Sequence, residues 1–102
     1  MYRPLPDGLT IKSSGIDGLG VVTTKEFSAN TVLGIVHIAN SNFPHGYIRT
    51  ALGAFYNHSD NPNCTVLNGF WHQISVKYLV TQRDIKENEE LTVNYSLYAV
   101  DE

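Results

Sequence analysis

Short runs of apolar residues alternate with turn residues along this 102-residue chain. In the N-terminal half, segments 9–12 and 20–24 read as strands on either side of a glycine-rich turn at 14–18. The longer apolar run Val32–Ile38 is rich in β-branched residues, which predicts a strand buried on both faces. This half of the chain therefore predicts strands alone.

The C-terminal half predicts more strands and one short helix. Segment 48–52 is the helical candidate, with one or two turns before Gly53. Asn68-Gly69, between the apolar segments 65–67 and 70–72, is a strong signal for a two-residue hairpin. In segment 73–80 every second residue is apolar, which predicts a half-buried strand with these inward positions: Ile74, Val76, Tyr78 and Val80.

Two segments of the chain are similar to each other. Residues 23–33 and 81–91, offset by 58 positions, both follow the order threonine, x, basic, acidic, apolar, x, x, asparagine, x, x, leucine. Two copies do not make a solenoid, but they favour two similar strand-turn-strand units related by an approximate twofold. Chance convergence of two surface turns is the alternative that the sequence leaves open.

Composition narrows the class of protein. A length of 102 residues suits one domain with a modest core, and 42% hydrophobic residues is ordinary for a globular chain. Seven basic and ten acidic side chains give a net charge of −3. Without a basic patch, direct nucleic-acid binding is disfavoured, whereas a lysine-rich protein partner would be attracted.

Cysteine, histidine and apolar content exclude other classes. The one cysteine, Cys64, cannot form an internal disulfide or supply a zinc cluster, which favours a reducing compartment. No apolar run is long enough to cross a membrane, and the polar N-terminus does not resemble a secretory signal. We therefore expect a soluble intracellular protein that does not bind membranes.

A metal-dependent hydrolase is the weakest alternative. The four histidines are separated by 8, 13 and 14 positions, and these spacings match no compact ligand motif. We expect no metal at these residues: His37, His45, His58 and His72.

Segment 54–63 is dense in Asn, His, Ser, Asp and Pro, which ordinarily indicates a turn. Its motif Asn57-His58-Ser59-x-x-Pro62-Asn63 is followed by the acidic turn and strand Glu90–Tyr95, and is preceded by Gly18-Leu19-Gly20. In this order and spacing the three motifs resemble the signature of SET-domain protein lysine methyltransferases. The resemblance covers residues 8 to 98, nearly the whole chain.

The resemblance implies a fold. We expect a mainly β chain with the SET-domain (β-clip) architecture: several small sheets, little helix, and a C-terminal segment threaded beneath a loop like a pseudoknot. Residues 1–102 would form a single SET domain. Only seven residues follow Tyr95 and no cysteine cluster is among them, so the chain looks like the minimal viral and bacterial members without a zinc-binding tail. Some of these members are homodimers, so we predict a homodimer. We expect it to be located in the cytoplasm or nucleus of a cell or virus-infected host.

The resemblance also implies S-adenosylmethionine as cofactor. Gly18, Leu19 and Gly20 would contact it through the main chain, since glycine permits a backbone approach that a Cβ would block. Asn57 and His58 would hold its amino-acid portion and adenine, and Tyr98 would help to cover the adenine. From the residues alone, the alternatives are a tight turn at Gly18-Leu19-Gly20 and a structural role for His58.

Tyr95 is the predicted catalytic residue. Alternation along the strand puts Leu91, Val93 and Tyr95 on one face. A buried tyrosine hydroxyl can orient the attacking amine and polarise the methyl group, and the resemblance identifies the matching tyrosine as catalytic. A lysine amine, with an ordinary pKa near 10.4, must first lose its proton, and desolvation beside a cationic sulfonium favours that loss. No dedicated base is then required.

Four aromatic residues are candidates for the wall of a lysine channel, where ring faces attract a cation: Tyr47, Phe55, Tyr56 and Tyr78. Core packing is the alternative for each. The sequence thus predicts a protein lysine N-methyltransferase acting on a lysine-containing protein, with histones as candidate substrates. The rival hypothesis is a catalytically inactive SET-like binding or regulatory module.

Overall fold

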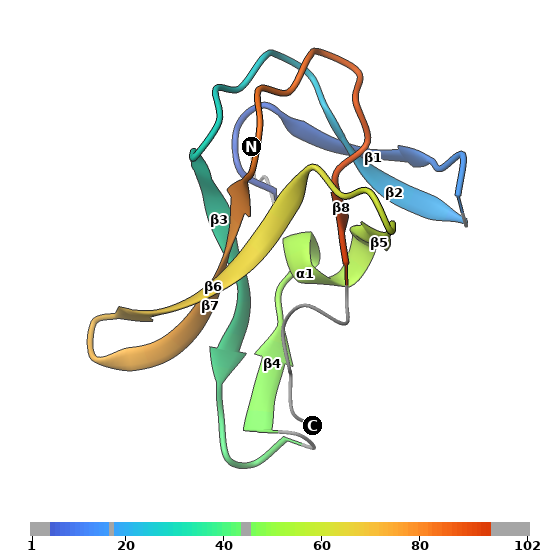
Figure 1. Cartoon of the computed structure of the whole chain (residues 1–102). Helices are drawn as coiled ribbons and strands as arrows, with labels where there is room; N and C mark the ends of the chain where they lie inside the picture. The colour runs from blue at the N-terminus through green and yellow to red at the C-terminus, as the bar shows by residue number, and fades with distance from the viewer. Residues whose placement is uncertain (1–4, 17, 44–45, 95–102) are drawn as a thin grey trace.

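The computed structural model describes residues 5–16, 18–43 and 46–94. Within these ranges the chain is mostly strand with one short helix, as the sequence predicts (Figure 1). The elements in order are β1 (Leu9–Ser13), β2 (Leu19–Thr23), β3 (Val32–Ala39), β4 (Tyr47–Arg49), α1 (Ala51–Phe55), β5 (Asn57–His58), β6 (Cys64–Trp71), β7 (Ile74–Thr81) and β8 (Thr92–Val93).

The strands form three small sheets. β1 and β2 make an antiparallel hairpin, which confirms the two predicted N-terminal strands. The largest sheet has the order β4-β3-β7-β6, and β5 pairs with β8 in a two-stranded parallel sheet. In Figure 1 the β6–β7 hairpin projects from the body, on the opposite side from the β1–β2 hairpin.

The burial of the two central strands differs from the predicted patterns. In β7 the inner face carries buried Lys77, Leu79 and Thr81, while Val76 and Val80 are buried on the other face. β7 is therefore buried on both faces and not half-buried as the alternation predicted. β3 was expected to be buried throughout, yet its first residue, Val32, is exposed.

The predicted hairpin at Asn68-Gly69 is wrong. Both residues lie inside β6, and the turn is at His72-Gln73, whose φ angles of 49° and 69° match the positive values of a type I′ turn. Gly69 is needed in the strand because a Cβ there would lie 2.6 Å from Cε2 of Tyr78. The Tyr78 ring thus covers a glycine on the neighbouring strand, which is a known way to stabilise a sheet at such a site.

The helix begins three residues later than predicted. Ile48 and Arg49 belong to β4, and α1 starts after Thr50, whose hydroxyl accepts a hydrogen bond from the Gly53 amide at 3.2 Å. This is an N-cap, which sequence periodicity does not locate well. Position 53 in α1 requires glycine, because a Cβ there would lie 2.9 Å from the Val36 carbonyl carbon of β3.

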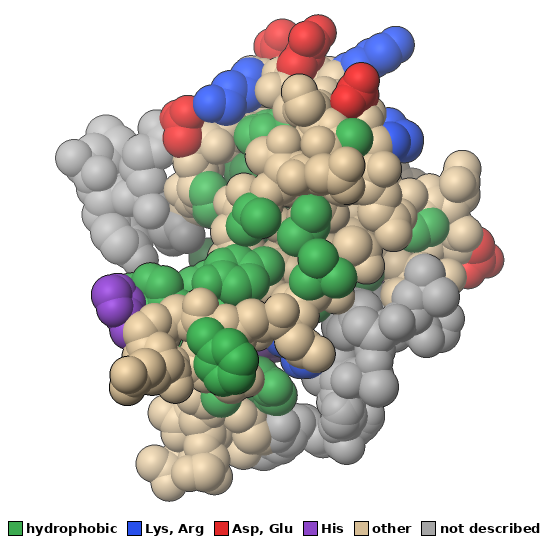
Figure 2. Space-filling view, turned by 60° about the vertical axis from the view of Figure 1, so that its left-hand side comes forward, with side chains coloured by type: hydrophobic (Ala, Val, Ile, Leu, Met, Phe, Trp, Pro, Cys, Tyr) green, Lys and Arg blue, Asp and Glu red, His purple; other side chains and the backbone are tan. Residues whose placement is uncertain are grey.

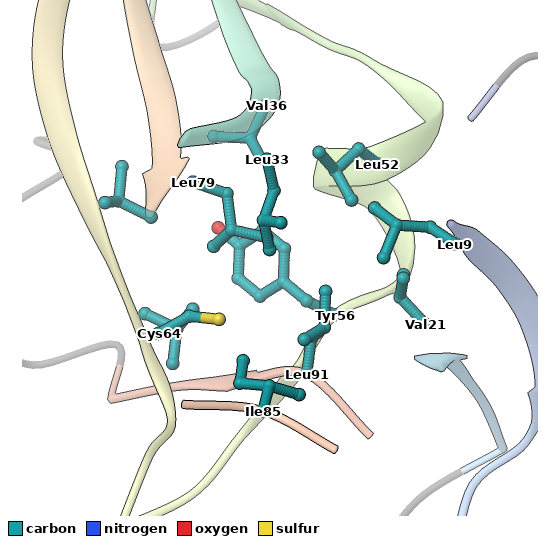
Figure 3. Close-up of a cluster of buried hydrophobic side chains, with 12 residues drawn as sticks. Leu9, Val21, Leu33, Val36, Leu52, Tyr56, Cys64, Leu79, Ile85 and Leu91 are labelled. Carbon is teal, nitrogen blue, oxygen red and sulfur yellow. The ribbon is translucent and has the colours of Figure 1, made fainter. Parts of the chain in front are cut away.

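The core lies between the sheets and α1 (Figure 3). Leu52, Leu79 and Leu91 are at most 1% exposed, and each comes from a different part of the chain. The other members of this buried cluster are Leu9, Val21, Leu33, Val36, Tyr56, Cys64, Val66, Ile85 and Val93.

The two similar segments pack against each other with matching hydrogen bonds. Asn30 N donates to Thr81 O at 2.9 Å, and the equivalent Asn88 N donates to Thr23 O at 2.8 Å. Both asparagines have positive φ, 63° and 66°. Midway between them, Phe27 and Ile85 exchange two backbone bonds.

The threonines that begin these segments repeat the symmetry. The Thr81 hydroxyl donates to Ser28 O and accepts from Thr31 N. The Thr23 hydroxyl donates to Lys86 O and accepts from Glu89 N. Positions 28 and 86, and 31 and 89, are equivalent, so the two segments make matching contacts, as the predicted approximate twofold requires.

β8 is held inside the loop that follows β5. Ser59 N, in one arm, donates to Val93 O at 3.1 Å. In the other arm the side-chain oxygen Oδ1 of the buried Asn63 accepts a hydrogen bond from Thr92 N at 2.9 Å. The backbone N of Asn63 donates to Thr92 Oγ1 at 3.2 Å. The chain thus passes beneath the loop, in the threaded arrangement that the resemblance implies.

Candidate functional site

Four parts of the chain meet at a polar cluster around the Glu90 carboxylate. The Ser14 hydroxyl lies 2.7 and 2.9 Å from its two oxygens, and Asn57 Nδ2 donates to Oε2 at 2.8 Å. The same Asn57 amide donates to the Leu19 carbonyl at 3.2 Å. β2, β5 and the segment that precedes β8 are thereby joined through side chains.

Gly20 makes this cluster possible. It is buried, and a Cβ there would lie 2.9 Å from the Glu90 carboxyl carbon and 3.2 Å from Asn57 Nδ2. Both atoms lie at the ends of flexible side chains, so a Cβ at position 20 would push them aside and change the hydrogen bonds just described. The requirement for glycine at position 20 is therefore packing of the cluster against the β2 backbone.

Gly18 and Leu19 form the exposed side of this cluster. Gly18 has φ of 53°, and no atom lies within 4 Å of the place that its Cβ would occupy. Leu19 is 51% exposed, although its carbonyl is held by Asn57. The structure thus brings Gly18, Leu19, Gly20 and Asn57 together, with open space beside the first glycine.

The parallel pairing of β5 with β8 positions the histidine. Asn57 lies opposite Thr92 and His58 lies opposite Val93. His58 Nε2 is 3.1 Å from Asp60 Oδ1, and the histidine side chain is 41% exposed. The predicted residues Tyr95 and Tyr98 lie outside the described residues, and β8 is the segment that leads to them.

Beside the cluster, Glu89 ties the acidic turn to the loop that encloses β8. Its carboxylate contacts the Arg83 guanidinium, accepts from Lys86 N at 3.0 Å and accepts from Asn63 Nδ2 at 3.2 Å. Burial raises the pKa of this carboxyl, but the three hydrogen bonds outweigh burial and lower the pKa below its ordinary value. Glu89 is therefore a structural anion in the described part of the chain.

The candidate channel aromatics are divided between different surroundings. Tyr56 is 6% exposed and belongs to the core, and Phe55 is partly buried against it (Figure 3). Tyr47 lies 6.1 Å from the His37 ring and 5.2 Å from Lys77 Nζ. Tyr78 points to the opposite face of β7 from Lys77, and its hydroxyl donates to Phe70 O at 3.0 Å. The four residues are thus not brought into one wall.

A row of polar side chains that includes a lysine and an arginine crosses the sheet next to Tyr47. Arg49, His37, Lys77 and Asn68 are register neighbours on the four strands. Lys77 is 7% exposed and donates to Asn68 Oδ1 at 2.6 Å. His37 Nδ1 is buried without a hydrogen-bond partner among the described residues, and burial, followed by the charges of Arg49 and Lys77, lowers the pKa of this histidine.

Sequence reasoning missed two functional neighbours. Ser14 was read as part of a turn and Glu90 as part of a strand motif, whereas both bind Asn57. Ser14 and Glu90 are 76 positions apart, so no local pattern could have paired them.

The structure also bears on two excluded classes. Within residues 5–16, 18–43 and 46–94, no three His, Cys, Asp or Glu side chains gather where they could hold a metal ion. In the same ranges, no helix has the length and apolar character needed to cross a membrane.

A hollow of about 440 Å³ lies between the similar segments, lined by Glu26, Phe27, Ser28, Asp84, Ile85 and Lys86. None of these is a predicted site residue.

Comparison with known proteins places these features in a family. The family model described as SET domain matches residues 36–96. A solved structure of a Plasmodium falciparum protein, provisionally named a histone methyltransferase, superposes with a TM-score of 0.74 at 22% sequence identity, covering 92% of this chain and 97% of that one. No curated protein sequence matches the chain. Since the family model spans more than half of the residues and includes the loop that encloses β8, the chain belongs to the SET-domain family.

Proposed function

We propose that this protein is an S-adenosylmethionine-dependent protein lysine N-methyltransferase. The observation that carries the proposal is the junction of Gly18–Gly20, Asn57 and the segment just before β8 in a chain of the SET-domain family. These segments are distant in sequence, and the Glu90 cluster joins them. A core alone would not need such a part-buried polar arrangement next to a glycine backbone.

The residues of this junction suit the cofactor. Open space beside Gly18 leaves room for a ligand to approach the main chain, and the Leu19 carbonyl is oriented by Asn57. Asn57 and His58 would hold the amino-acid portion and the adenine, with Tyr98 against the ring. S-adenosylmethionine supplies the methyl group when it is bound.

The chain's own groups would then position the amine. Tyr95 follows β8 by two residues, and we assign its hydroxyl the role of orienting the substrate amine towards the methyl group. The substrate is a lysine side chain of a protein. Desolvation in an apolar channel would lower the pKa of its amine and so favour the neutral form that attacks the methyl group. A net charge of −3 favours encounter with lysine-rich proteins, histones among them.

The test is transfer of labelled methyl from S-adenosylmethionine to core histones and to cell lysate, with Tyr95→Phe beside the wild type. We expect label on lysine, reduced at least about a hundredfold in Tyr95→Phe, because a donor that acts in the transition state is worth this much. Cofactor affinity, measured by calorimetry, should be unchanged in the variant.

Asn57→Ala tests the cofactor site, and Asn61→Ala is its matched control. Asn57 is joined to the cluster, whereas Asn61 is an exposed residue of the same loop. We expect weaker cofactor binding in Asn57→Ala alone. No cofactor binding and no transfer by the wild type would contradict the proposal and favour the inactive binding module.

A further inference from the structure

β6 presents an unprotected edge. It has eight residues, Cys64–Trp71, and among residues 5–16, 18–43 and 46–94 its one strand partner in the four-stranded sheet is β7. Its sequence contains no charged residue and no proline. Beyond Val66 its apolar side chains are exposed, with Leu67 at 51%, Phe70 at 73% and Trp71 at 49%. A long apolar edge of this kind is a template for pairing with another strand.

The other edge of the same sheet is protected by ordinary means. β4 has three residues, Tyr47–Arg49, and it ends in an exposed arginine. Short length and a charged side chain both prevent edge-to-edge pairing. The contrast indicates that the β6 edge has a partner.

The surface around this edge also lacks charge. In Figure 2 hydrophobic side chains gather across the middle of the face, while most of the charged side chains in view lie along its upper and right margins. The exposed apolar residues of the hairpin are Leu67, Phe70, Trp71 and Ile74. Depletion of charge and enrichment of aromatic residues are features of the centre of an interface.

The backbone of β6 can accept a second strand. In a two-residue hairpin the closing pair, here Trp71 and Ile74, exchanges hydrogen bonds, so Asn68 and Phe70 direct their amide and carbonyl groups away from β7. The Phe70 carbonyl receives the Tyr78 hydroxyl at 3.0 Å and retains a second lone pair. Two consecutive outward-facing residues thus offer donors and acceptors at the edge.

We propose that this edge binds the β6 edge of a second copy of the chain, antiparallel and centred on Gly69. In this register Asn68 lies opposite the partner's Phe70 and exchanges backbone hydrogen bonds with it. Leu67 lies opposite the partner's Trp71 on the outer face of the sheet. The partner's Leu67 likewise meets Trp71, so the register forms two equivalent Leu67–Trp71 contacts. The contact is isologous, so it closes as a dimer.

The area is sufficient for a dimer of this type. The exposed parts of the β6 residues Leu67, Phe70 and Trp71 amount to roughly 350 Å² per chain, given that aromatic side chains bury about 150–250 Å² each. Two copies would bury about 700 Å² from these side chains, and the backbone and polar atoms of the two strands would bring the total towards the ~1,000 Å² of a specific interface. An extended peptide of another protein would lack the matching tryptophan and leucine.

The first experiment is the molar mass of the full chain by light scattering and sedimentation across the micromolar range. We expect twice the monomer mass for the wild type and the monomer mass for Leu67→Lys. Phe43→Lys is the matched control, because Phe43 is similarly exposed at 48% but follows β3, and it should remain dimeric. Circular dichroism would establish that both variants are folded.

A wild-type monomer at all these concentrations would overturn the proposal and favour a foreign peptide at this edge. A dimer that survives Leu67→Lys would equally overturn it. Neither result depends on methyl transfer, so the outcome is separate from that of the proposed function.

Cross-linking tests the register. Positions 67 and 71 of one chain are about 13 Å apart along a strand, too far for a disulfide. An equimolar mixture of Leu67→Cys chains and Trp71→Cys chains should form a covalent dimer on mild oxidation, because it places one cysteine opposite the other and keeps one Leu67–Trp71 contact. Each single variant alone should not cross-link. The buried Cys64 does not compete. Equal cross-linking in the single variants, or none in the mixture, would contradict the register.

Discussion

At the scale of the residue, Gly20 shows how a missing side chain can organise a site. The Glu90 carboxylate and the Asn57 amide occupy the space in which a Cβ would project. The family resemblance anticipated glycines at 18 and 20 and an asparagine at 57. It did not anticipate that Gly20 would contact protein atoms rather than open space, because the contact depends on residues 14, 57 and 90 together.

Gly20→Ala should therefore disrupt the cluster. We expect a loss of about 1–3 kcal/mol in the free energy of unfolding, because overpacking of a buried position costs this much, and weaker cofactor binding. Gly15→Ala is the control, since no atom lies within 4 Å of its Cβ position. Chemical denaturation and calorimetric titration measure both effects. Equal stability of the two variants would contradict the assigned role of Gly20.

His37 should make stability depend on pH. Its pKa is lowered in the folded state, so below about pH 6.5 the unfolded chain binds the proton more readily. Stability attributable to His37 is thus complete above this pH and decreases as the pH falls towards the folded pKa. His37→Leu should show a flatter dependence between pH 6.5 and 5 in urea unfolding. His72→Asn is the control, because position 72 is exposed and asparagine tolerates its positive φ of 49°, and it should follow the wild type. Parallel curves for His37→Leu and wild type would count against this.

At the scale of the element, the N-terminal half was easier to predict than the C-terminal half. The sequence located β1, β2 and the glycine-rich turn between them, and alternation located β7, but Asn68-Gly69 was a misleading turn signal inside β6. Tertiary packing overrode local preference there, because the Tyr78 ring covers Gly69 and Lys77 binds the Asn68 side chain. The turn moved to His72-Gln73, which carries no conventional turn signature.

The two similar segments give a symmetric prediction. Thr23→Val and Thr81→Val each remove a buried hydroxyl that donates one hydrogen bond and accepts another. We expect each to lose about 1–3 kcal/mol of unfolding free energy, because a backbone amide and a carbonyl are left unpaired.

Thr24→Val is the control for this pair, because Thr24 is exposed next to Thr23. Urea denaturation would compare the three variants. A large cost at one threonine and none at the other would show that the symmetry of the geometry is not a symmetry of energy.

At the scale of the whole molecule, the repeat at 23–33 and 81–91 was the sequence feature that carried the most structural information. It predicted that two distant segments adopt one conformation, and the matching bonds of Asn30 and Asn88 follow from it. The threading of β8 could be expected from the family alone, since no local pattern encodes passage beneath a loop. Charge and composition constrained the class of partner and not the arrangement of sheets.

A single domain that dimerises has a distinctive thermal signature. The melting temperature of the wild type should rise with protein concentration, because association stabilises the folded state by mass action. Leu67→Lys should melt independently of concentration, in one transition whose calorimetric and van't Hoff enthalpies agree. Differential scanning calorimetry at several concentrations makes the measurement. Two separate transitions in the variant would contradict a single domain spanning residues 1–102.

The buried Cys64 gives the chain its own reporter of opening. The thiol is 1% exposed, and burial raises its pKa to about 12, so the reactive thiolate is scarce in the folded state. An alkylating reagent can therefore modify it only when the core opens, and at high reagent concentration the labelling rate becomes the opening rate itself. Because the chain has one cysteine, a single mass increment counts each molecule that has unfolded, with no engineered probe.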